Sequence, residues 1–251
     1  RERGTDLVTW RSTDRGRTWH RTAVINDVPE SAREGLHAML ADARGNLFAA
    51  WLDLRATGMR LYGSRSTDGG RTWSKNVEIY ASPAGTICQC CDPSLAFASD
   101  GRLWVMWRNV MDGSRDLWAA SSRDGLHFDA ARKLGEGTWK LNACPMDGGA
   151  IASVDGRIVS AWRREGDVFL AEDGRPERKL GTGKDVAMIH TARGVYVAWS
   201  MGAGLELQRP GAAAPEPRAT TGAFVNLAAL ADGTVLAAWE TGMGIETKQV
   251  R

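Results

Sequence analysis

The chain has 251 residues, of which 43% are hydrophobic and 25% are charged, as in an ordinary globular protein. Its net charge is only +2, and Arg residues are scattered among Asp and Glu, which does not favour nucleic acid as a partner. No stretch approaches the ~20 apolar residues that a membrane-spanning helix needs, and the chain opens without a signal-peptide pattern. We therefore expect a single domain over residues 1–251 that has no membrane span.

Two segments of the chain, residues 12–19 and 66–73, are nearly identical. They read Ser-Thr-Asp-Arg-Gly-Arg-Thr-Trp and Ser-Thr-Asp-Gly-Gly-Arg-Thr-Trp. A third copy at 121–128 keeps the Ser, the Gly and an aromatic residue but shifts the Asp by one position, and a fourth around 172–174 is vestigial. Short polar residues that bond their own backbone, followed by Gly with φ > 0, are typical of a hairpin turn. We expect the terminal aromatic residue to pack beneath this turn.

A second repeat alternates with the first. It consists of an apolar run, a tight turn such as Ser-Asp-Gly or Ala-Asp-Gly, and a short β-rich run that ends in Trp. Each copy therefore predicts two antiparallel strands joined by a turn. The five copies run from Gly45 to Trp51, Gly101 to Trp107, Gly156 to Trp162, Gly194 to Trp199 and Gly233 to Trp239.

Together the two repeats define a unit of strand A, turn, strand B ending in Trp, loop, strand C, turn and strand D. Four-stranded antiparallel units repeated around a ring protect their strand edges, which is the architecture of a β-propeller. The motif Ser-x-Asp-x-Gly-x-x-Trp resembles the Asp box, or BNR repeat, of the sialidase superfamily. The resemblance implies an all-β propeller of sialidase type with Asp boxes on the blade periphery. It does not imply the activity, because Asp boxes also occur in non-hydrolytic proteins.

The two ends of the chain bear on the number of blades. The chain starts with a strand C at 6–12 and a strand D at 18–25, and residues 244–251 form another strand C. We expect six blades, with the first blade incomplete because its first two strands would lie upstream of residue 1. Five blades are the alternative if the two ends of the chain pair with each other.

In a propeller the D-to-A and B-to-C loops share the face around the channel mouth, and this is where sialidases bind substrate. Three successive B-to-C loops carry an Arg soon after the strand-B Trp, which would form a cationic rim for a carboxylate ligand. The alternative is that each Arg covers its own Trp and pairs with a nearby acid. The candidates for binding a small-molecule or glycan ligand are Asp53, Arg55, Arg108, Arg163 and Glu240.

All four cysteines fall in two D-to-A loops of neighbouring blades, three of them in Cys88-Gln89-Cys90-Cys91 and the fourth at Cys144. A disulfide would join Cys144 to one of the other three. A metal site would use the thiolates as soft ligands for copper(I) or zinc. A reactive thiol is the third interpretation, although no activating His is evident in the local sequence. Softer ligands near these loops are His37, Met39 and Met146.

The Cys-x-Cys-Cys segment and the later Cys-Pro-Met-Asp-Gly also resemble a set of bacterial sialidase-like proteins of unsettled function. That set shares Trp-x-Asp-x-Arg, here residues 51–55, and the Trp-Arg at 107–108. The resemblance implies that these loops form one site, and disulfides suit an exported protein, so we expect a bacterial protein that is periplasmic or secreted.

Whether the chain is an enzyme is left open by its sequence. A retaining sialidase needs three Arg, a Tyr nucleophile with its Glu, and an Asp acid/base. The family's Arg-Ile-Pro signature is absent, and none of the three Tyr lies beyond residue 196. Our leading hypothesis is a binding or metal-site propeller that acts through its cysteine loops. The alternatives are an exo-glycosidase that hydrolyses terminal sialic acid, and a disulfide-stapled scaffold for another exported protein.

Overall fold

A computed structural model describes residues 4–250 of the chain. Every regular element in this part is a β-strand, and no α-helix occurs between residues 4 and 250. Accordingly, the described residues include no helix with the length and hydropathy to cross a membrane. The prediction of an all-β fold is confirmed. Residue 251, the last of the predicted final strand, lies outside the described part.

The chain divides into two compact units. The first unit comprises Arg1–Lys133 and Lys140–Pro145, and the second comprises Leu134–Trp139 and Met146–Arg251. Each unit has its own hydrophobic clusters and its own sheets. All four cysteines belong to the first unit.

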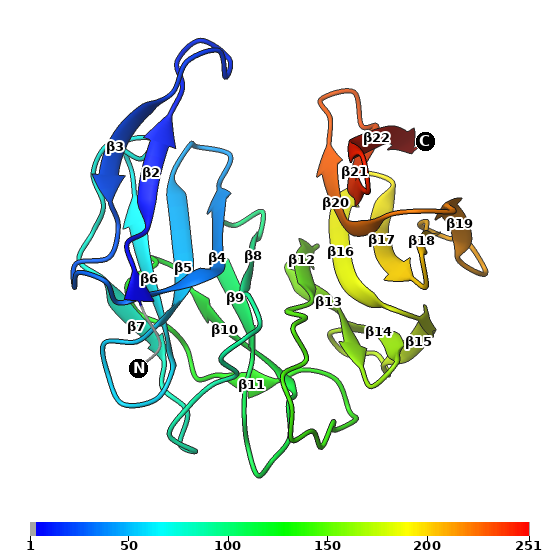
Figure 1. The fold of residues 1–251 in the computed structure, drawn as a ribbon, viewed down its shortest axis with the longest axis horizontal. Helices are drawn as coiled ribbons and strands as arrows, with labels where there is room; N and C mark the ends of the chain where they lie inside the picture. The colour runs from blue at the N-terminus through cyan, green and yellow to red at the C-terminus, as the bar shows by residue number, and fades with distance from the viewer. Residues whose placement is uncertain (1–3, 251) are drawn as a thin grey trace. The chain divides into compact units, whose positions relative to one another are not determined.

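The first unit contains three antiparallel sheets, coloured blue to green in Figure 1. Their strand orders are β1-β4-β5-β6-β7, β11-β10-β9-β8 and β2-β3. The strands are β1 (Gly4–Thr5), β2 (Val8–Arg11), β3 (His20–Val24), β4 (Ala32–Ala41), β5 (Leu47–Asp53), β6 (Arg60–Ser66), β7 (Val77–Tyr80), β8 (Ser94–Phe97), β9 (Leu103–Arg108), β10 (Leu117–Ser122) and β11 (Arg132–Lys133).

The second unit also contains three sheets, which run from green to red in Figure 1. Their orders are β12-β13-β14-β15, β16-β17-β18-β19 and β20-β21-β22. The strands are β12 (Ala150–Val154), β13 (Arg157–Arg164), β14 (Asp167–Glu172), β15 (Arg178–Thr182), β16 (Lys184–Thr191), β17 (Gly194–Met201), β18 (Gly204–Gln208), β19 (Glu216–Ala219), β20 (Ala223–Ala229), β21 (Val235–Thr241) and β22 (Gly244–Val250).

Apart from β1, which pairs with β4, successive strands pair with one another in every sheet, as the two alternating repeats predict. Strands β4 to β7, β8 to β11, β12 to β15 and β16 to β19 are four complete A-to-D sets. Strands β20 to β22 correspond to A, B and C, and β2 with β3 to C and D. The short turns within each set permit only antiparallel pairing, because parallel neighbours need a long crossover connection.

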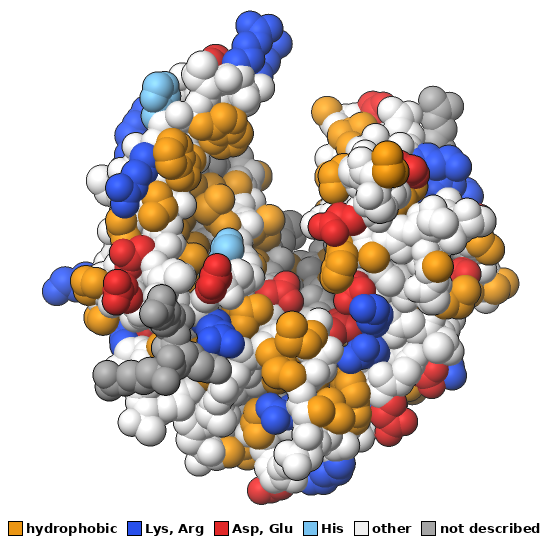
Figure 2. All heavy atoms as spheres, viewed as in Figure 1, with side chains coloured by type: hydrophobic (Ala, Val, Ile, Leu, Met, Phe, Trp, Pro, Cys, Tyr) orange, Lys and Arg blue, Asp and Glu red, His pale blue; other side chains and the backbone are white. Residues whose placement is uncertain are grey.

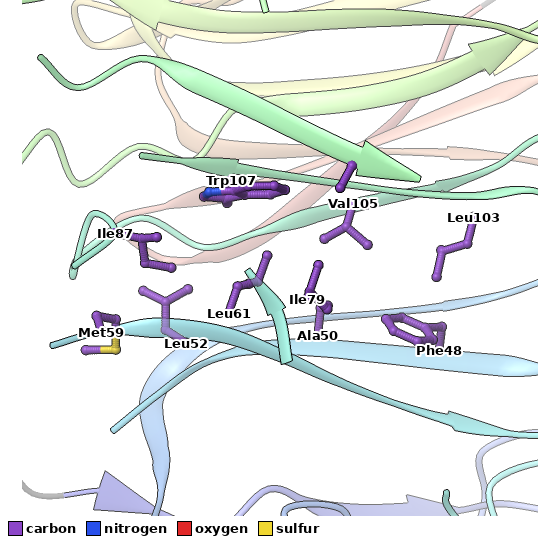
Figure 3. Close-up of a cluster of buried hydrophobic side chains, with 11 residues drawn as sticks. Phe48, Ala50, Leu52, Met59, Leu61, Ile79, Ile87, Leu103, Val105 and Trp107 are labelled. Carbon is purple, nitrogen blue, oxygen red and sulfur yellow. The ribbon is translucent and has the colours of Figure 1, made fainter. Parts of the chain in front are cut away.

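The Trp that ends each strand B is the repeated core residue. All five of these indoles are buried, with exposed fractions between 0% and 4%. Figure 3 shows one of them, Trp107, in a cluster that Phe48, Leu52 and Leu61 complete from β5 and β6. In the second unit, Trp199 and Trp239 fill the equivalent clusters. Large aromatic side chains fill the space between neighbouring sheets and supply much of the buried apolar area.

The Asp-box turns form as the sequence predicts. In the second copy, Ser66 Oγ accepts the Gly70 N–H at 2.9 Å, and Asp68 accepts the N–H and the hydroxyl of Thr72 at 3.0 and 2.6 Å. Gly70 adopts a φ of 80°, a conformation that glycine reaches without strain. The third copy makes a similar turn that is one residue shorter, in which Ser122 bonds the Asp two positions on and accepts the N–H of Gly125 three positions on.

The aromatic residues of the two full Asp boxes differ in burial. Trp73 is half-buried and packs against the cluster that contains Trp51. Trp19 lies against its own turn as predicted, because its Nε1–H donates to Gly16 O at 3.1 Å, but it is 57% exposed there. Its turn closes the two-stranded sheet β2–β3, which offers little surface to cover an indole. Figure 2 shows hydrophobic side chains gathered over β2, and the exposed ones of this sheet are Val8, Trp10 and Val24.

Candidate functional site

The cysteine loop joins β7 to β8 and is anchored at one point by a buried side chain. Ile87 is fully buried between Met59 and Trp107 (Figure 3). The N–H of Ile87 donates to Met59 O at 3.0 Å, and the N–H of Cys88 donates to Arg108 O at 3.0 Å. These two backbone bonds fix Cys88 beside the end of β9 before the chain turns away.

The four sulfur atoms form one cluster that contains a disulfide and two thiols. Cys90 is bonded to Cys144, with Cα atoms 6.1 Å apart, whereas Cys88 and Cys91 are buried thiols that take no part in a disulfide. Cys88 Sγ lies 3.7 Å from Cys90 Sγ and 3.6 Å from Cys91 Sγ, and the last two sulfurs lie 4.0 Å apart. The structure thus selects the Cys144–Cys90 pairing from the three that the sequence allowed and leaves a dithiol beside it.

Two arginines make the surroundings of Cys88 positive. Arg115 Nη1 lies 3.7 Å from Cys88 Sγ, and the buried Arg108 donates from Nη1 to Arg115 O at 2.6 Å. The pKa of Cys88 is lowered to about 6, first by its hydrogen bond with Cys91, then by the N–H of Cys90 and the charges of Arg115 and Arg108, while burial opposes this. These contacts favour the thiolate of Cys88, the form that attacks electrophiles and binds metals.

The loop that carries Arg115 also holds the segment that carries Cys144. Arg115 Nε donates to Leu141 O at 3.3 Å, and the N–H of Leu141 donates to Gly113 O at 3.1 Å. Lys140 Nζ donates to Asp112 O on the same loop. Both ends of the disulfide are consequently positioned by contacts with the loop between β9 and β10.

The softer ligands named from the sequence have other surroundings. His37 is exposed on β4. In the described chain, one group of three potential metal-ligand atoms lies within 4.8 Å of one another, and the ring nitrogens of His37 do not belong to it. That group consists of Cys88, Cys90 and Cys91 alone. Met39, on the same strand as His37, is 55% exposed, and Met146 is 69% exposed. The sulfur cluster is thus the only part of the predicted ligand set that these contacts bring together.

Asp53 and Arg55 form a closed clasp inside the first unit. Asp53 is fully buried and accepts hydrogen bonds from Trp51 Nε1 at 2.8 Å and from both ends of the Arg55 guanidinium at 2.9 Å. Arg55 also donates to Asp27 and Asn76 at 2.8 Å each. The Trp-x-Asp-x-Arg motif therefore ties β5 to the loops after β3 and before β7, which occupies the donors that a carboxylate ligand would use.

The remaining ligand candidates lie in different places. Arg108 belongs to the cysteine cluster described above. Arg163, in the second unit, lies 3.6 Å from Asp147 and stacks over the ring of Trp139 at 5.2 Å. Glu240 is exposed on β21. Arg115 was not a candidate from the sequence, because nothing in its local pattern distinguishes it from other loop arginines.

Comparisons with known proteins bear on the fold. No protein-family model matches the chain, and no curated protein matches it. Among solved structures it is similar to the GH93 α-L-arabinofuranosidase of Fusarium graminearum, with a TM-score of 0.66 and 12% identity, over 99% of this chain and 86% of that chain. It is also similar to the α-L-arabinanase of Penicillium chrysogenum, with a TM-score of 0.58 and 17% identity, over 98% and 67% of the two chains.

A third similar structure is the leech intramolecular trans-sialidase, with a TM-score of 0.53 and 15% identity, over 98% of this chain and 36% of that chain. These likenesses, with the six sheets of the described chain, confirm the prediction of a six-bladed β-propeller of sialidase type. They support the resemblance to sialidase-like proteins at this coarse level. Identities this low show the fold, and the fold hosts several chemistries, so the site must be interpreted from its own residues.

Proposed function

We propose that the chain is an exported β-propeller that binds a soft metal ion, copper(I), through Cys88 and Cys91. The observation that carries this proposal is the pair of buried thiol sulfurs 3.6 Å apart beside two arginines. Thiolates are the protein ligands that copper(I) prefers, and a lowered thiol pKa weakens the competition of protons with the metal. The neighbouring disulfide supports an extracytoplasmic location.

The ligand set favours copper(I) over zinc. Structural zinc is held almost always by four Cys, His or carboxylate ligands. With Cys90 in a disulfide, the described group offers two thiols and no His or carboxylate. Copper(I) is satisfied by two or three sulfur ligands, and its affinity for them is high because both partners are soft.

The test is an anaerobic competition of the non-reduced protein against a coloured copper(I) chelator. We expect stoichiometric copper(I) binding that Cys88→Ser and Cys91→Ser each abolish and that His37→Ala, a control on β4, leaves intact. A rise in melting temperature with copper(I) should accompany binding, because a ligand of the native state stabilises it. Zinc binding of equal strength, or copper binding that survives both serine variants, would refute the proposal.

A second candidate function is hydrolysis of a glycan, which the comparisons favour because the similar solved structures are glycoside hydrolases. Tyr62 donates its hydroxyl to Glu78 at 3.1 Å, which is a Tyr–Glu pair of the kind that a retaining sialidase needs, but Arg60 occupies the same carboxylate oxygen at 2.6 Å and neutralises its charge. Burial and this carboxylate raise the pKa of Tyr62, so it stays a neutral phenol. A hydrolase would instead need a pair of carboxylates.

The assay for this second function is turnover of fluorogenic aryl α-L-arabinofuranosides and sialosides. Release of the fluorophore by wild-type protein and by Cys88→Ser alike would establish a glycosidase whose chemistry is separate from the thiols. Absence of turnover together with copper(I) binding would leave the metal site as the function of this chain. Another exported protein or a glycan remains the proposed partner in either case.

A further inference from the structure

The disulfide in the sulfur cluster has one buried and one exposed end. Cys90 is 9% exposed, whereas Cys144 is exposed at the surface of the first unit. The thiols of Cys88 and Cys91, each 1% exposed, lie on the buried side, 3.7 and 4.0 Å from Cys90 Sγ. A disulfide that contacts a thiol at one end and water at the other has a nucleophile and a solvated leaving group in place.

We propose that the cluster is an intramolecular thiol–disulfide exchange site in which Cys88 displaces Cys144 from Cys90. The Cys88 sulfur gives its proton to solvent and attacks Cys90 Sγ, and a Cys88–Cys90 bond forms. The Cys90–Cys144 bond breaks, and its electron pair leaves on Cys144 Sγ, which takes up a proton from water. One disulfide is exchanged for another, so the step needs no external oxidant or reductant.

The geometry assigns the attack to Cys88 and not to Cys91. Cys88 Sγ is the closer of the two to Cys90 Sγ, and the Arg115 guanidinium contacts it at 3.7 Å. A Cys90–Cys91 bond would close a ring around a single peptide unit, which resists the planar trans geometry of that unit. A disulfide between Cys88 and Cys90 encloses one more residue, so its larger ring is compatible with planar trans peptide units.

The exchange has two consequences for the molecule. It frees the segment Lys140–Pro145 from its covalent bond to the cysteine loop, and it exposes a thiol at Cys144. An exposed thiol can form a mixed disulfide with the thiol or disulfide of another molecule. This activity needs no metal ion, so it goes beyond the copper site and is tested separately from it.

The experiment alkylates native protein with iodoacetamide in the absence of reductant and then identifies the labelled peptides. Trypsin releases Cys144 alone on residues 141–157, whereas the three loop cysteines share residues 76–102, so labelling of each is read separately. We expect Cys144 to be labelled while residues 76–102 acquire an internal disulfide. The rate should become independent of reagent concentration at high reagent, because the internal exchange then limits it.

The matched variants are Cys88→Ser and Cys91→Ser, which both keep the Cys90–Cys144 disulfide. We expect labelling of Cys144 to stop in Cys88→Ser and to continue at a reduced rate in Cys91→Ser, which changes the hydrogen-bond partner of Cys88, with circular dichroism showing that both are folded. Wild-type protein that keeps Cys144 unlabelled would overturn the proposal. Cys88→Ser that is labelled as fast as wild type, or loss of labelling in Cys91→Ser alone, would overturn it as well.

Discussion

At the scale of single residues, the environment of Cys88 is the most unusual in the described chain. A thiol in an apolar interior ordinarily has a raised pKa, because burial disfavours the thiolate. Here the hydrogen bond with Cys91, the N–H of Cys90 and the charges of Arg115 and Arg108 outweigh burial and lower the pKa to about 6. Four separate contributions therefore converge on one sulfur atom.

A titration of the ultraviolet absorbance of thiolate measures this effect directly. We expect a transition near pH 6 in native wild-type protein and its loss in Cys88→Ser. Arg115→Gln should move the transition to higher pH, because it removes a positive charge that stabilises the thiolate. The control is Arg123→Gln, whose side chain is 71% exposed and should leave the transition where it is. A transition that persists in Cys88→Ser would show that another group titrates.

The same shift makes the stability of the fold depend on pH. Because the pKa of Cys88 is lower in the folded than in the unfolded chain, the thiolate stabilises the native state above the unfolded value of about 8.5. That contribution is lost as the pH falls through about 6. The urea midpoint of wild type relative to Cys88→Ser should therefore fall over this interval. If the difference in urea midpoint between wild type and Cys88→Ser were the same at both ends of this pH interval, the lowered pKa of Cys88 would be contradicted.

At the scale of elements, the fold is held by polar groups at the ends of its strands. The clasp of Asp53 and Arg55 and the Asp-box turns both satisfy donors and acceptors where a strand stops. A strand that ends without such partners would leave buried polar groups without hydrogen bonds, which is costly. The repeats in the sequence mark these strand ends.

The clasp predicts a large loss of stability in Asp53→Ala. This change leaves the guanidinium of Arg55, only 15% exposed, and the Trp51 N–H without their main acceptor. Removing one partner of a buried ion pair typically costs about 3–5 kcal/mol of the free energy of unfolding, which urea denaturation measures. The control is Arg60→Ala, which breaks an exposed pair with Glu78 and should change the midpoint little. Equal effects of the two changes would argue against a structural role for the clasp.

The Asp box predicts a smaller, local effect. Asp68→Ala removes the acceptor for the N–H and hydroxyl of Thr72, so the melting temperature should fall. The pKa of Asp68 is lowered, first by the Thr72 hydroxyl, so its stabilising effect is present above the unfolded value and is lost on acidification through the folded one. Glu34→Ala, at an exposed position on β4, serves as the control. We also expect Asp68→Ala to bind copper(I) as wild type does. If a stably folded Asp68→Ala lost copper(I) binding, the Asp box would have to be part of the binding site.

At the scale of the whole molecule, the disulfide is the one covalent bond between distant parts of the first unit. Its two cysteines are 54 residues apart in the sequence. A cross-link of this span stabilises chiefly by restricting the unfolded chain. The strands between them form the whole β8–β11 sheet, so the disulfide closes a loop around one blade.

Loss of this cross-link should be visible in global stability. We expect Cys144→Ser to lower the free energy of unfolding by about 2–4 kcal/mol in urea denaturation. Cys91→Ser, which removes a thiol and keeps the disulfide, is the matched control. If Cys91→Ser were as destabilising as Cys144→Ser, the effect would belong to packing in the cluster and not to the cross-link.

The sequence by itself determined the architecture, because the signals for it are local. Turns with Ser, Asp and Gly and a Trp at the end of every strand B are set by neighbours a few residues away, and the structure has the predicted strand pairs at all five of these Trp. The same periodicity placed all four cysteines in two D-to-A loops. The repeat pattern could not show that the side chain of Trp19 is exposed, because its exposure depends on how many strands its sheet contains.

The tertiary structure alone decided the chemistry of the site, because its contacts join residues that are far apart in the sequence. The sequence left three pairings open for Cys144, and only the approach of the two loops selects Cys90. Arg115 contacts Cys88 although the two residues are 27 positions apart in the sequence, and no local sequence pattern indicates this contact. The guanidinium of Arg55, which the sequence offered as a ligand group, is turned inward by Asp53, Asp27 and Asn76. The sequence repeats determine where the strands and loops lie. Charge and hydrogen bonding between distant loops determine the chemical environment of the side chains in those loops.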